Sequence, residues 1–474
     1  MTIDKKKLAA DRRLVWIHYA MLPTLNGYAE VFSVFAGEPA HIRLARKPGL
    51  NLFAMFKTFT VEAIALRNVV TGAETAVPPP KGVAIKREKP KNYRDEGADY
   101  AARVEIATDA LEPGLYECVI RDSWGTASKD IYFNVKPARY RDYDLACVLP
   151  TFTWQAYNRL AGGSFYSDDL GPVRTITTQR PINRTGDNTI NAAIPFLRAF
   201  AEAGARIVCI DSWDLHHAAV PGGRPPVMAL LTHDEYWSQP MRIAVDRYVK
   251  SGGVLMVMAG NVCWWKITVE GTNLTVDKTQ ESYQRRRETQ SQGHQWFQQG
   301  EPEERTFIAS FRFGGYAVER AAKKPELRKL TDRVDASLLR NSGSLKIERP
   351  DHPIFQGVAL DPGNRLGEEV PVVYREIDAV PLTAEGKVDR TWYDADKIEP
   401  EILATGTVVR NRLFNVPVDQ AGIVVEADVA KGHVLHMGTF GWSRGLSQGN
   451  ARVKRVVQNA YRYCRQLARE RLGR

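Results

Sequence analysis

The stretch Val227-Met-Ala-Leu-Leu-Thr-His-Asp-Glu-Tyr-Trp237 decides how this chain folds. Its first residues form an uninterrupted apolar run, which is typical of a strand that is buried on both faces of a parallel sheet. The run ends abruptly in His233, Asp234 and Glu235. The sequence therefore predicts a strand whose carboxyl end carries an imidazole and two carboxylates, and open α/β sheets build their sites at such strand ends.

Apolar runs and amphipathic patterns alternate on both sides of this stretch. An amphipathic pattern follows it, and Gly252-Gly253 then leads into another apolar run. Two similar runs and a second helical pattern precede it. This alternation predicts a doubly wound parallel sheet. The predicted strands are Asp144–Pro150, Arg206–Asp211, Val227–Leu231 and Val254–Met258, and the predicted helices are Asn188–Gly204 and Ser238–Lys250.

The first third of the chain has a different pattern. Short runs of β-branched and aromatic residues are separated by Gly, Pro, Asn and Asp, which predicts an antiparallel, immunoglobulin-like β-sandwich over residues 1–140. Residues 141–474 are then assigned to an α/β domain. Within it we expect an irregular insertion at about 265–350, sheet-edge strands at Gly422–Glu426 and Gly432–Gly438, and a closing helix at Ala451–Leu472.

Length and charge limit the class of protein. A chain of 474 residues is expected to form two or three domains. Its 65 basic and 55 acidic residues give a net charge of +10, spread along the chain without an aromatic–basic stripe. This distribution favours a solvated surface over nucleic-acid binding. No stretch reaches membrane-spanning length, and Leu14–Leu22 lacks the uniform apolar character of a signal peptide.

The five cysteines are widely spaced and lie mostly in apolar runs, with no CxxC pair. This pattern predicts buried, reduced thiols and argues against thiolate zinc. We therefore expect a cytoplasmic protein.

The polar tip of the quoted stretch has two interpretations. His233 and Glu235 are two residues apart, so on an extended segment they point to the same side. Glu235 is then a candidate metal ligand or base, and His233 a ligand or proton shuttle. The alternative is helix capping by Asp234 or Ser238, with Pro240 just inside the helix. Capping does not require a histidine and a glutamate on one side.

Two more segments follow predicted strands. Thr151–Asn158, which continues to Gly162-Gly163-Ser164, either lines the rim of a site or packs Trp154 and Tyr157 against a neighbouring domain. Asn261 either offers its amide to a substrate or occupies a turn that requires an unusual backbone angle. His433 and His436 are interpreted as buried structural histidines.

Four segments together resemble the large subunit of N,N-dimethylformamidase and its relatives. The resemblance covers most of the chain and implies an immunoglobulin-like domain followed by a glutamine-amidotransferase-like domain, in the order expected above. Amidotransferases of this kind use a nucleophilic cysteine in a Gly-x-Cys-x-Gly turn. Cys263 is instead followed by two tryptophans, which disfavours cysteine catalysis. The four segments are Leu149–Asn158, Asp211–Leu215, Thr232–Trp237 and Ser251–Asn261.

The resemblance also implies a mononuclear iron held by two tyrosine phenolates and one glutamate. Glu235 matches the glutamate and Tyr157 matches one tyrosine. Tyr116, in the segment Pro113-Gly-Leu-Tyr116, is the best match for the other. Two phenolates at neutral pH require a strong Lewis acid such as Fe(III), because a free phenol has a pKa of about 10. Asp234 and Tyr236 are then assigned to capping and packing.

Three further residues are implied as catalytic: His233, Asn261 and, in Leu366-Gly-Glu-Glu369, Glu369. Iron would polarise an amide carbonyl and activate water, while His233 or Glu369 moves protons toward the departing amine. This predicts an iron-dependent amidohydrolase that cleaves the C–N bond of a small N-substituted amide. We expect this chain to form a homo-oligomer. The resemblance also implies a possible small partner subunit, because one accompanies the known enzyme. The pocket is predicted to be wider than dimethylformamide needs, lined by Phe152, Trp154, Trp213, Trp264 and Trp265.

A non-catalytic binding or scaffold subunit with a degenerate amidotransferase-like fold is the alternative from another functional class. The two interpretations differ in whether the protein holds a metal.

Overall fold

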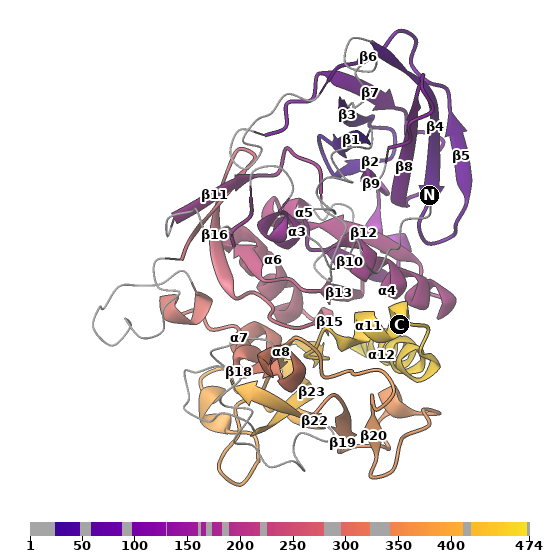
Figure 1. Ribbon diagram of the computed structural model, residues 1–474. Helices are drawn as coiled ribbons and strands as arrows, with labels where there is room; N and C mark the ends of the chain where they lie inside the picture. The colour runs from indigo at the N-terminus through magenta and orange to yellow at the C-terminus, as the bar shows by residue number, and fades with distance from the viewer. Residues whose placement is uncertain are drawn as a thin grey trace. The chain divides into compact units, whose positions relative to one another are not determined.

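The computed structural model describes residues 24–47, 58–87, 97–128, 130–159, 163–166, 173–182, 189–218, 225–278, 295–322, 342–410 and 419–471. The protein is mixed α/β and forms two compact units (Figure 1). The first comprises Met1–Lys136, Arg159–Gly163 and Thr177–Asn183, and the second comprises Pro137–Asn158, Ser164–Ile176 and Arg184–Arg474. Within the described ranges, no helix is long and apolar enough to span a bilayer.

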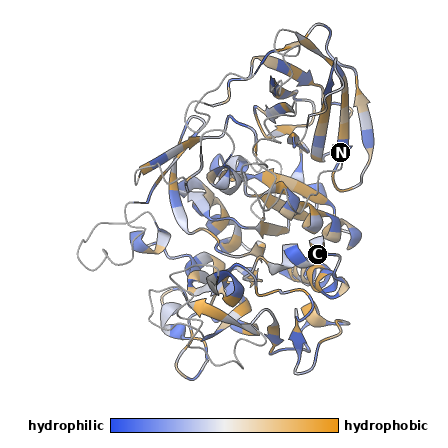
Figure 2. Cartoon of the chain, viewed as in Figure 1, coloured by the Kyte–Doolittle hydropathy of each residue, from blue (hydrophilic) through white to orange (hydrophobic). Residues whose placement is uncertain are grey.

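The first unit consists of two sheets that share one core. One has the order β1-β3-β7 and the other β2-β9-β8-β4-β5, with β6 beside β4. Residues along β7 are alternately buried and exposed, as a half-buried antiparallel sheet requires, and Figure 2 shows such changes of colour along the strands. The elements are β1 (Thr24–Ala29), β2 (Ser33–Phe35), β3 (Ala40–Lys47), β4 (Phe59–Asn68), β5 (Glu74–Val77), β6 (Ala84–Ile85), β7 (Ala102–Ile106), β8 (Gly114–Asp122) and β9 (Tyr132–Lys136).

The second unit contains a large mixed sheet. Five strands are parallel, in the order β12-β10-β13-β15-β24, and four antiparallel strands, β23-β22-β18-β21, extend the sheet beyond β24. The predicted parallel strands are confirmed. They are β10 (Leu145–Leu149), β12 (Ile207–Asp211), β13 (Val227–Thr232) and β15 (Val254–Ala259). The fifth parallel strand is β24 (Gly432–His436), and the antiparallel strands are β23 (Asp419–Val429), β22 (Glu401–Arg410), β18 (Ser310–Ala317) and β21 (Glu376–Ala379).

The order of the parallel strands fixes where a site can form. Along the sheet the chain places its second, first, third, fourth and fifth parallel strands side by side. The direction of winding therefore reverses between β10 and β13, and ligands of open α/β sheets bind outside the carboxyl ends of the strands at such a reversal. The helices are α3 (Thr151–Tyr157), α4 (Ile190–Glu202), α5 (Ser212–His216), α6 (Gln239–Lys250), α7 (Glu304–Phe307), α8 (Val318–Ala322), α11 (Gly441–Ser447) and α12 (Ala451–Arg471).

Two expectations about this unit are wrong. Gly422–Glu426 and Gly432–Gly438 belong to β23 and β24, which lie inside the sheet between β15 and β22. Their neighbours come from distant parts of the chain, so a local pattern does not show that they are interior. The supposedly irregular insertion contains a hairpin and further strands, although 279–294 and 323–341 lie outside the described residues. These elements include β16 (Trp265–Glu270), β17 (Asn273–Asp277), β18 and β19 (Leu345–Ile347).

Candidate active site

The polar tip after β13 is held rigidly by its neighbours. Thr232, the last residue of β13, has a φ of 68°, which turns the chain out of the strand. The amides of Glu235 and Tyr236 donate to Thr153 Oγ1 of α3 at 3.0 and 3.2 Å. The Glu235 carbonyl accepts from the amide of Trp265 at 2.9 Å. The element after β10 and the start of β16 therefore position Glu235 at the reversal of the sheet.

Two tyrosine hydroxyls converge on the Glu235 carboxylate. Tyr157, at the end of α3, donates to Glu235 Oε2 at 2.6 Å. The Tyr166 hydroxyl lies 2.9 Å from the Tyr157 hydroxyl and 3.0 and 3.1 Å from the two carboxylate oxygens. The two rings stack with centroids 4.5 Å apart. Tyr236, from β14 (Tyr236–Ser238), in turn donates to the Tyr166 oxygen at 2.7 Å.

Burial and charge set the protonation of this cluster. Burial, together with the negative charge of Glu235, raises the pKa of the Tyr157 and Tyr166 phenols well above their usual value. Burial also acts to raise the pKa of Glu235, but the hydrogen bond and charge of His233 and the charge of Lys278 outweigh it and lower that pKa. The cluster is thus a carboxylate that accepts hydrogen bonds from neutral phenols.

His233 is fully buried and is fixed at both ring nitrogens. Nδ1 lies 3.0 Å from the Gly260 carbonyl, which only accepts, so Nδ1 carries a proton. Nε2 lies 3.1 Å from both the Tyr157 hydroxyl and Glu235 Oε2. Burial lowers the pKa of His233, but the hydrogen bond and charge of Glu235 outweigh it, so the pKa is raised overall. Gly260 has to be a glycine, because a Cβ there would lie 2.3 Å from the Glu376 carbonyl oxygen.

Asn261 and Glu376 face His233 from the ends of β15 and β21. Asn261 has a φ of 55°, and its amide donates to Asp378 Oδ1 at 2.7 Å. Its Nδ2 donates to Glu376 Oε2 at 3.0 Å, and this carboxylate oxygen lies 3.7 Å from His233 Nε2. Asn261 Oδ1 is buried without a hydrogen-bond partner among the described residues. The turn with an unusual backbone angle is therefore confirmed for Asn261, whose side chain also lies in the cluster, while its contact with a substrate stays a prediction.

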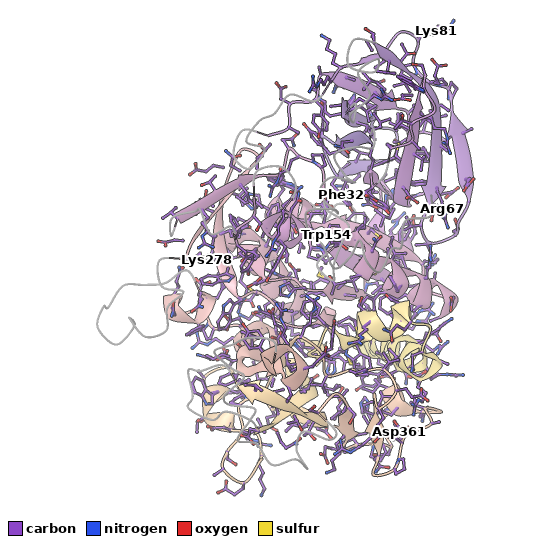
Figure 3. All side chains as sticks on the ribbon, in the orientation of Figure 1. Phe32, Arg67, Lys81, Trp154, Lys278 and Asp361 are labelled. Atoms are coloured by element: carbon purple, nitrogen blue, oxygen red, sulfur yellow. The ribbon has the colours of Figure 1, made fainter. Side chains whose placement is uncertain are left out.

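A buried lysine lies against the tyrosines. Lys278, labelled in Figure 3, directly follows the β16–β17 hairpin and is 3 % exposed. Its Nζ lies 3.8 Å from the centre of the Tyr166 ring, 4.8 Å from that of Trp265 and 5.3 Å from that of Tyr236. A cation over an aromatic face is attracted by the electrons of the ring. The segment predicted to be irregular thus supplies positive charge to the cluster.

Four of the six predicted site residues lie together. Tyr157, His233, Glu235 and Asn261 form the cluster described above. Glu369 does not: its side chain is 72 % exposed and lies 3.1 Å from Arg452 Nη2 on α12. The second carboxylate near His233, after that of Glu235, is that of Glu376. The segment that carries both glutamates has no periodic pattern, so the sequence offers no means of choosing between them.

Tyr116 lies in the first unit, where its hydroxyl donates to the Glu112 carbonyl at 2.7 Å and its ring stacks on Phe133. Burial raises the pKa of its phenol. Its hydroxyl is therefore engaged within that unit, and Tyr166 is the second tyrosine beside Glu235. Tyr166 follows Gly163-Ser164, so aromatic residues after the first parallel strand were a usable signal.

The capping assignments need correction. Ser238 is the residue before α6, but no side-chain hydrogen bond caps this helix, and the Ser238 hydroxyl instead pairs with His216 Nδ1 at 2.8 Å. Burial raises the pKa of the Asp234 carboxyl to about 7. Tyr236, assigned to packing, donates a hydrogen bond within the tyrosine cluster.

The residues assigned structural roles keep them. All five cysteines are free and buried, and burial raises the pKa of Cys263, which disfavours a thiolate nucleophile. His436 Nδ1 donates to the Phe307 carbonyl at 2.8 Å, and its Nε2 lies 3.3 Å from Asp378 Oδ2. In the described parts of the chain, no group of three or more His, Cys, Asp and Glu residues is placed to hold a metal ion.

Comparison with known proteins places the chain in a family. A family model described as N,N-dimethylformamidase beta subunit-like, C-terminal, matches residues 72–455, which is most of the chain and includes every residue of the cluster. A search of curated proteins finds no match. The resemblance inferred from the four sequence segments is confirmed: the chain belongs to the N,N-dimethylformamidase beta subunit-like family.

Proposed function

We propose that this chain is an iron-dependent amidohydrolase that cleaves the C–N bond of a small N-substituted amide. The family takes its name from N,N-dimethylformamidase. The observation that carries the proposal is the convergence of the Tyr157 and Tyr166 hydroxyls on the Glu235 carboxylate, at 2.6 and 3.0 Å. Neutral phenols and a carboxylate this close form a set of oxygen donors that a cation can share.

The donor set fits one small, highly charged ion. The oxygens of the three side chains lie 2.6 to 3.1 Å apart, so one small ion would be within reach of all three. Phenol and carboxylate oxygens are hard ligands and suit a hard ion. Because burial raises the pKa of both phenols, only a strong Lewis acid would displace their protons. Three anionic ligands would then balance the charge of Fe(III).

The chain's own residues would divide the work around such an ion. Tyr157, Tyr166 and Glu235 would hold it, and the ion would supply a Lewis acid for the amide carbonyl and for water. Asn261 Oδ1, buried and without a partner among the described residues, would accept a hydrogen bond from that water. The bond from His233 Nδ1 to Gly260 leaves only Nε2 to exchange protons. We assign proton delivery to the departing amine to His233 and Glu376, which lie 3.7 Å apart.

We also propose the finer fold assignments. The five parallel strands have the order of a doubly wound sheet, and Tyr157 and Glu235 follow the two strands between which the winding reverses. This supports an amidotransferase-like second unit that has lost its cysteine. In the first unit, the bond from Tyr116 to the carbonyl four residues upstream has the geometry of the tyrosine corner of immunoglobulin-like sandwiches.

The family name includes a beta subunit, and we propose that the chain acts in an oligomer, with or without a small partner subunit. Light scattering on the purified protein, alone and co-expressed with its genomic neighbours, tests this assignment.

Metal analysis and activity together test the proposed function. Purified protein should contain one iron per chain and show a phenolate-to-iron absorption band, and it should release amine from a panel of N-substituted formamides and acetamides. Tyr157→Phe and Tyr166→Phe should each weaken the band. Tyr393→Phe is the matched control, because this buried hydroxyl donates to the Ile308 carbonyl outside the cluster. A protein that stays colourless and free of iron after anaerobic reconstitution would instead support the scaffold interpretation.

A further inference from the structure

The half-buried side of the cluster is formed by two segments that are tied together. Thr439 Oγ1 donates to the Val372 carbonyl at 2.6 Å and accepts from the Tyr374 amide at 3.2 Å. Gly441, the first residue of α11, lies so close to Val372 that an added Cβ would meet its carbonyl oxygen at 1.9 Å. The start of α11 and the segment before β21 are therefore packed directly against each other, and both reach the cluster around Glu235.

Each segment contributes one residue to that cluster. Phe440, directly before α11, packs its ring against the His233 ring with centroids 4.6 Å apart. Glu376 is the first residue of β21, and its Oε2 lies 3.7 Å from His233 Nε2. Glu376 is half-buried, whereas His233 is not exposed at all. Glu376 and the start of α11 therefore form one half-buried side of the cluster, and Tyr157 and Tyr166 are half-buried as well.

An arginine lies close in sequence to each of these two residues: Arg444 to Phe440, and Arg375 to Glu376. Arg444 is four residues after Phe440, so the two side chains share a face of the helical turn. Its guanidinium lies over the Tyr374 ring at 4.4 Å, and Tyr374 is two residues before Glu376. Arg375 lies 5.7 Å from the same ring centre. Two positive side chains therefore flank one aromatic ring next to the half-buried side of the cluster.

We infer that the substrate carries a carboxylate in addition to its amide, and that Arg444 binds this carboxylate. This inference rests on the proposed function and specifies the substrate class. A guanidinium that stacks on a ring keeps its N–H edge for bidentate contact with a planar carboxylate. Among the described residues, Arg444 pairs with Glu319, whose half-exposed carboxylate places Oε2 3.8 Å from Nη1, which is beyond hydrogen-bond distance. Dimethylformamide carries no group that would use such a contact.

Matched substrates test the inference. Amine release is measured for N-formylglycine and N-acetylglycine against N-propylformamide and N-propylacetamide, which are neutral and of similar length. The intact protein should have the higher kcat/KM for the carboxylates. Arg444→Met should lower the ratio of kcat/KM for carboxylate over neutral substrate by about ten- to a hundredfold, the range expected for a hydrogen bond to a charged group, mainly through KM. Arg444→Lys keeps the positive charge but loses the planar pair of N–H groups. Its kcat/KM ratio should lie between those of the intact protein and of Arg444→Met.

Arg455→Met is the control, because Arg455 is exposed on α12 and should leave the ratio unchanged. Equal or better hydrolysis of the neutral amides by the intact protein would overturn the inference and leave the amidohydrolase standing. An unchanged ratio in Arg444→Met would do the same. If none of the four amides is hydrolysed and no iron is bound, the proposed function is wrong, and the inference about the substrate carboxylate is wrong as well.

Discussion

Two glutamates in the second unit, the buried Glu235 and the half-buried Glu426, have almost the same kinds of partner and different surroundings. Glu235 lies with His233, Tyr157 and Tyr166. Glu426, on β23, lies 3.2 Å from Nε2 of both His352 and His433 and accepts a hydrogen bond from Tyr463 at 2.9 Å. Each cluster combines one carboxylate with histidine and tyrosine, so residue types alone do not distinguish a site from a structural network.

The two clusters differ in their position on the sheet and in whether their hydrogen-bonding groups all have partners. Glu235 follows the end of a parallel strand, whereas Glu426 lies within β23. Around Glu426, both nitrogens of His433 face carboxylates, at 2.8 Å from Asp428 and 3.2 Å from Glu426. Around Glu235, one tyrosine hydroxyl bonds to another, and the neighbouring Asn261 Oδ1 is unpartnered among the described residues. The second cluster therefore ties β23 and β24 to α12, whereas the first keeps one buried acceptor, Asn261 Oδ1, without a partner among the described residues.

The largest contrast is expected when each glutamate is neutralised. Glu235→Gln should remove the bound iron and lower kcat/KM by about three orders of magnitude, the scale seen when a group that stabilises the transition state is lost. Glu426→Gln should retain one iron per chain. Metal content and amine release, measured on both variants, check this prediction. Loss of iron from both variants alike would remove the distinction between the two clusters.

Stability should respond in the opposite order. Glu426→Gln removes the carboxylate that pairs with both His352 and His433, of which only His433 keeps another, that of Asp428. We expect it to lower the free energy of unfolding by about 3 kcal/mol. Burial acts to raise the pKa of Glu426, but the hydrogen bonds and charges of His352 and His433 outweigh this and hold it well below its ordinary value of 4.5. A depressed pKa stabilises the fold above pH 4.5 and loses that effect as the pH falls further.

Urea unfolding of the intact chain and of Glu426→Gln at several pH values measures this difference. It should be constant near neutrality and should shrink as the pH falls below 4.5. A difference that grows toward acid pH would mean that Glu426 is not the ionised partner of the two histidines.

The sequence predicted the framework of the site better than its membership. The strip from Val227 to Trp237 predicts a parallel strand with Glu235 at its end, because apolar length and an abrupt polar stop are local properties. Glu376 cannot be found in this way, since its place beside His233 depends on how the antiparallel half of the sheet returns to β15. The interior position of β23 and β24 was missed for the same reason: strand neighbours are set by chain topology, whereas the local pattern is set by burial.

The two tyrosines outside the proposed ligand set provide a smaller contrast. Tyr236 donates to the Tyr166 oxygen at 2.7 Å, and Tyr463 donates to Glu426 at 2.9 Å. Tyr236→Phe removes a hydrogen bond from a proposed ligand, so it should move the absorption band to longer wavelength and lower activity about tenfold. Tyr463→Phe should cost about 1 kcal/mol of stability without shifting the band. An unshifted band in Tyr236→Phe would return this residue to the packing role assigned from the sequence.

The smallest effect is expected at Glu369, which is the exposed counterpart of the Glu235 and Glu426 carboxylates. Among the described residues it pairs with Arg452, which also pairs with Asp361, and exposed ion pairs contribute about 0–1 kcal/mol. Glu369→Gln should therefore change the free energy of unfolding by less than about 1 kcal/mol and leave kcat/KM within twofold. Glu376→Gln, assayed beside it, should lower kcat. Equal activity loss in both variants would show that Glu369 reaches the substrate by a rearrangement of the segment before β21.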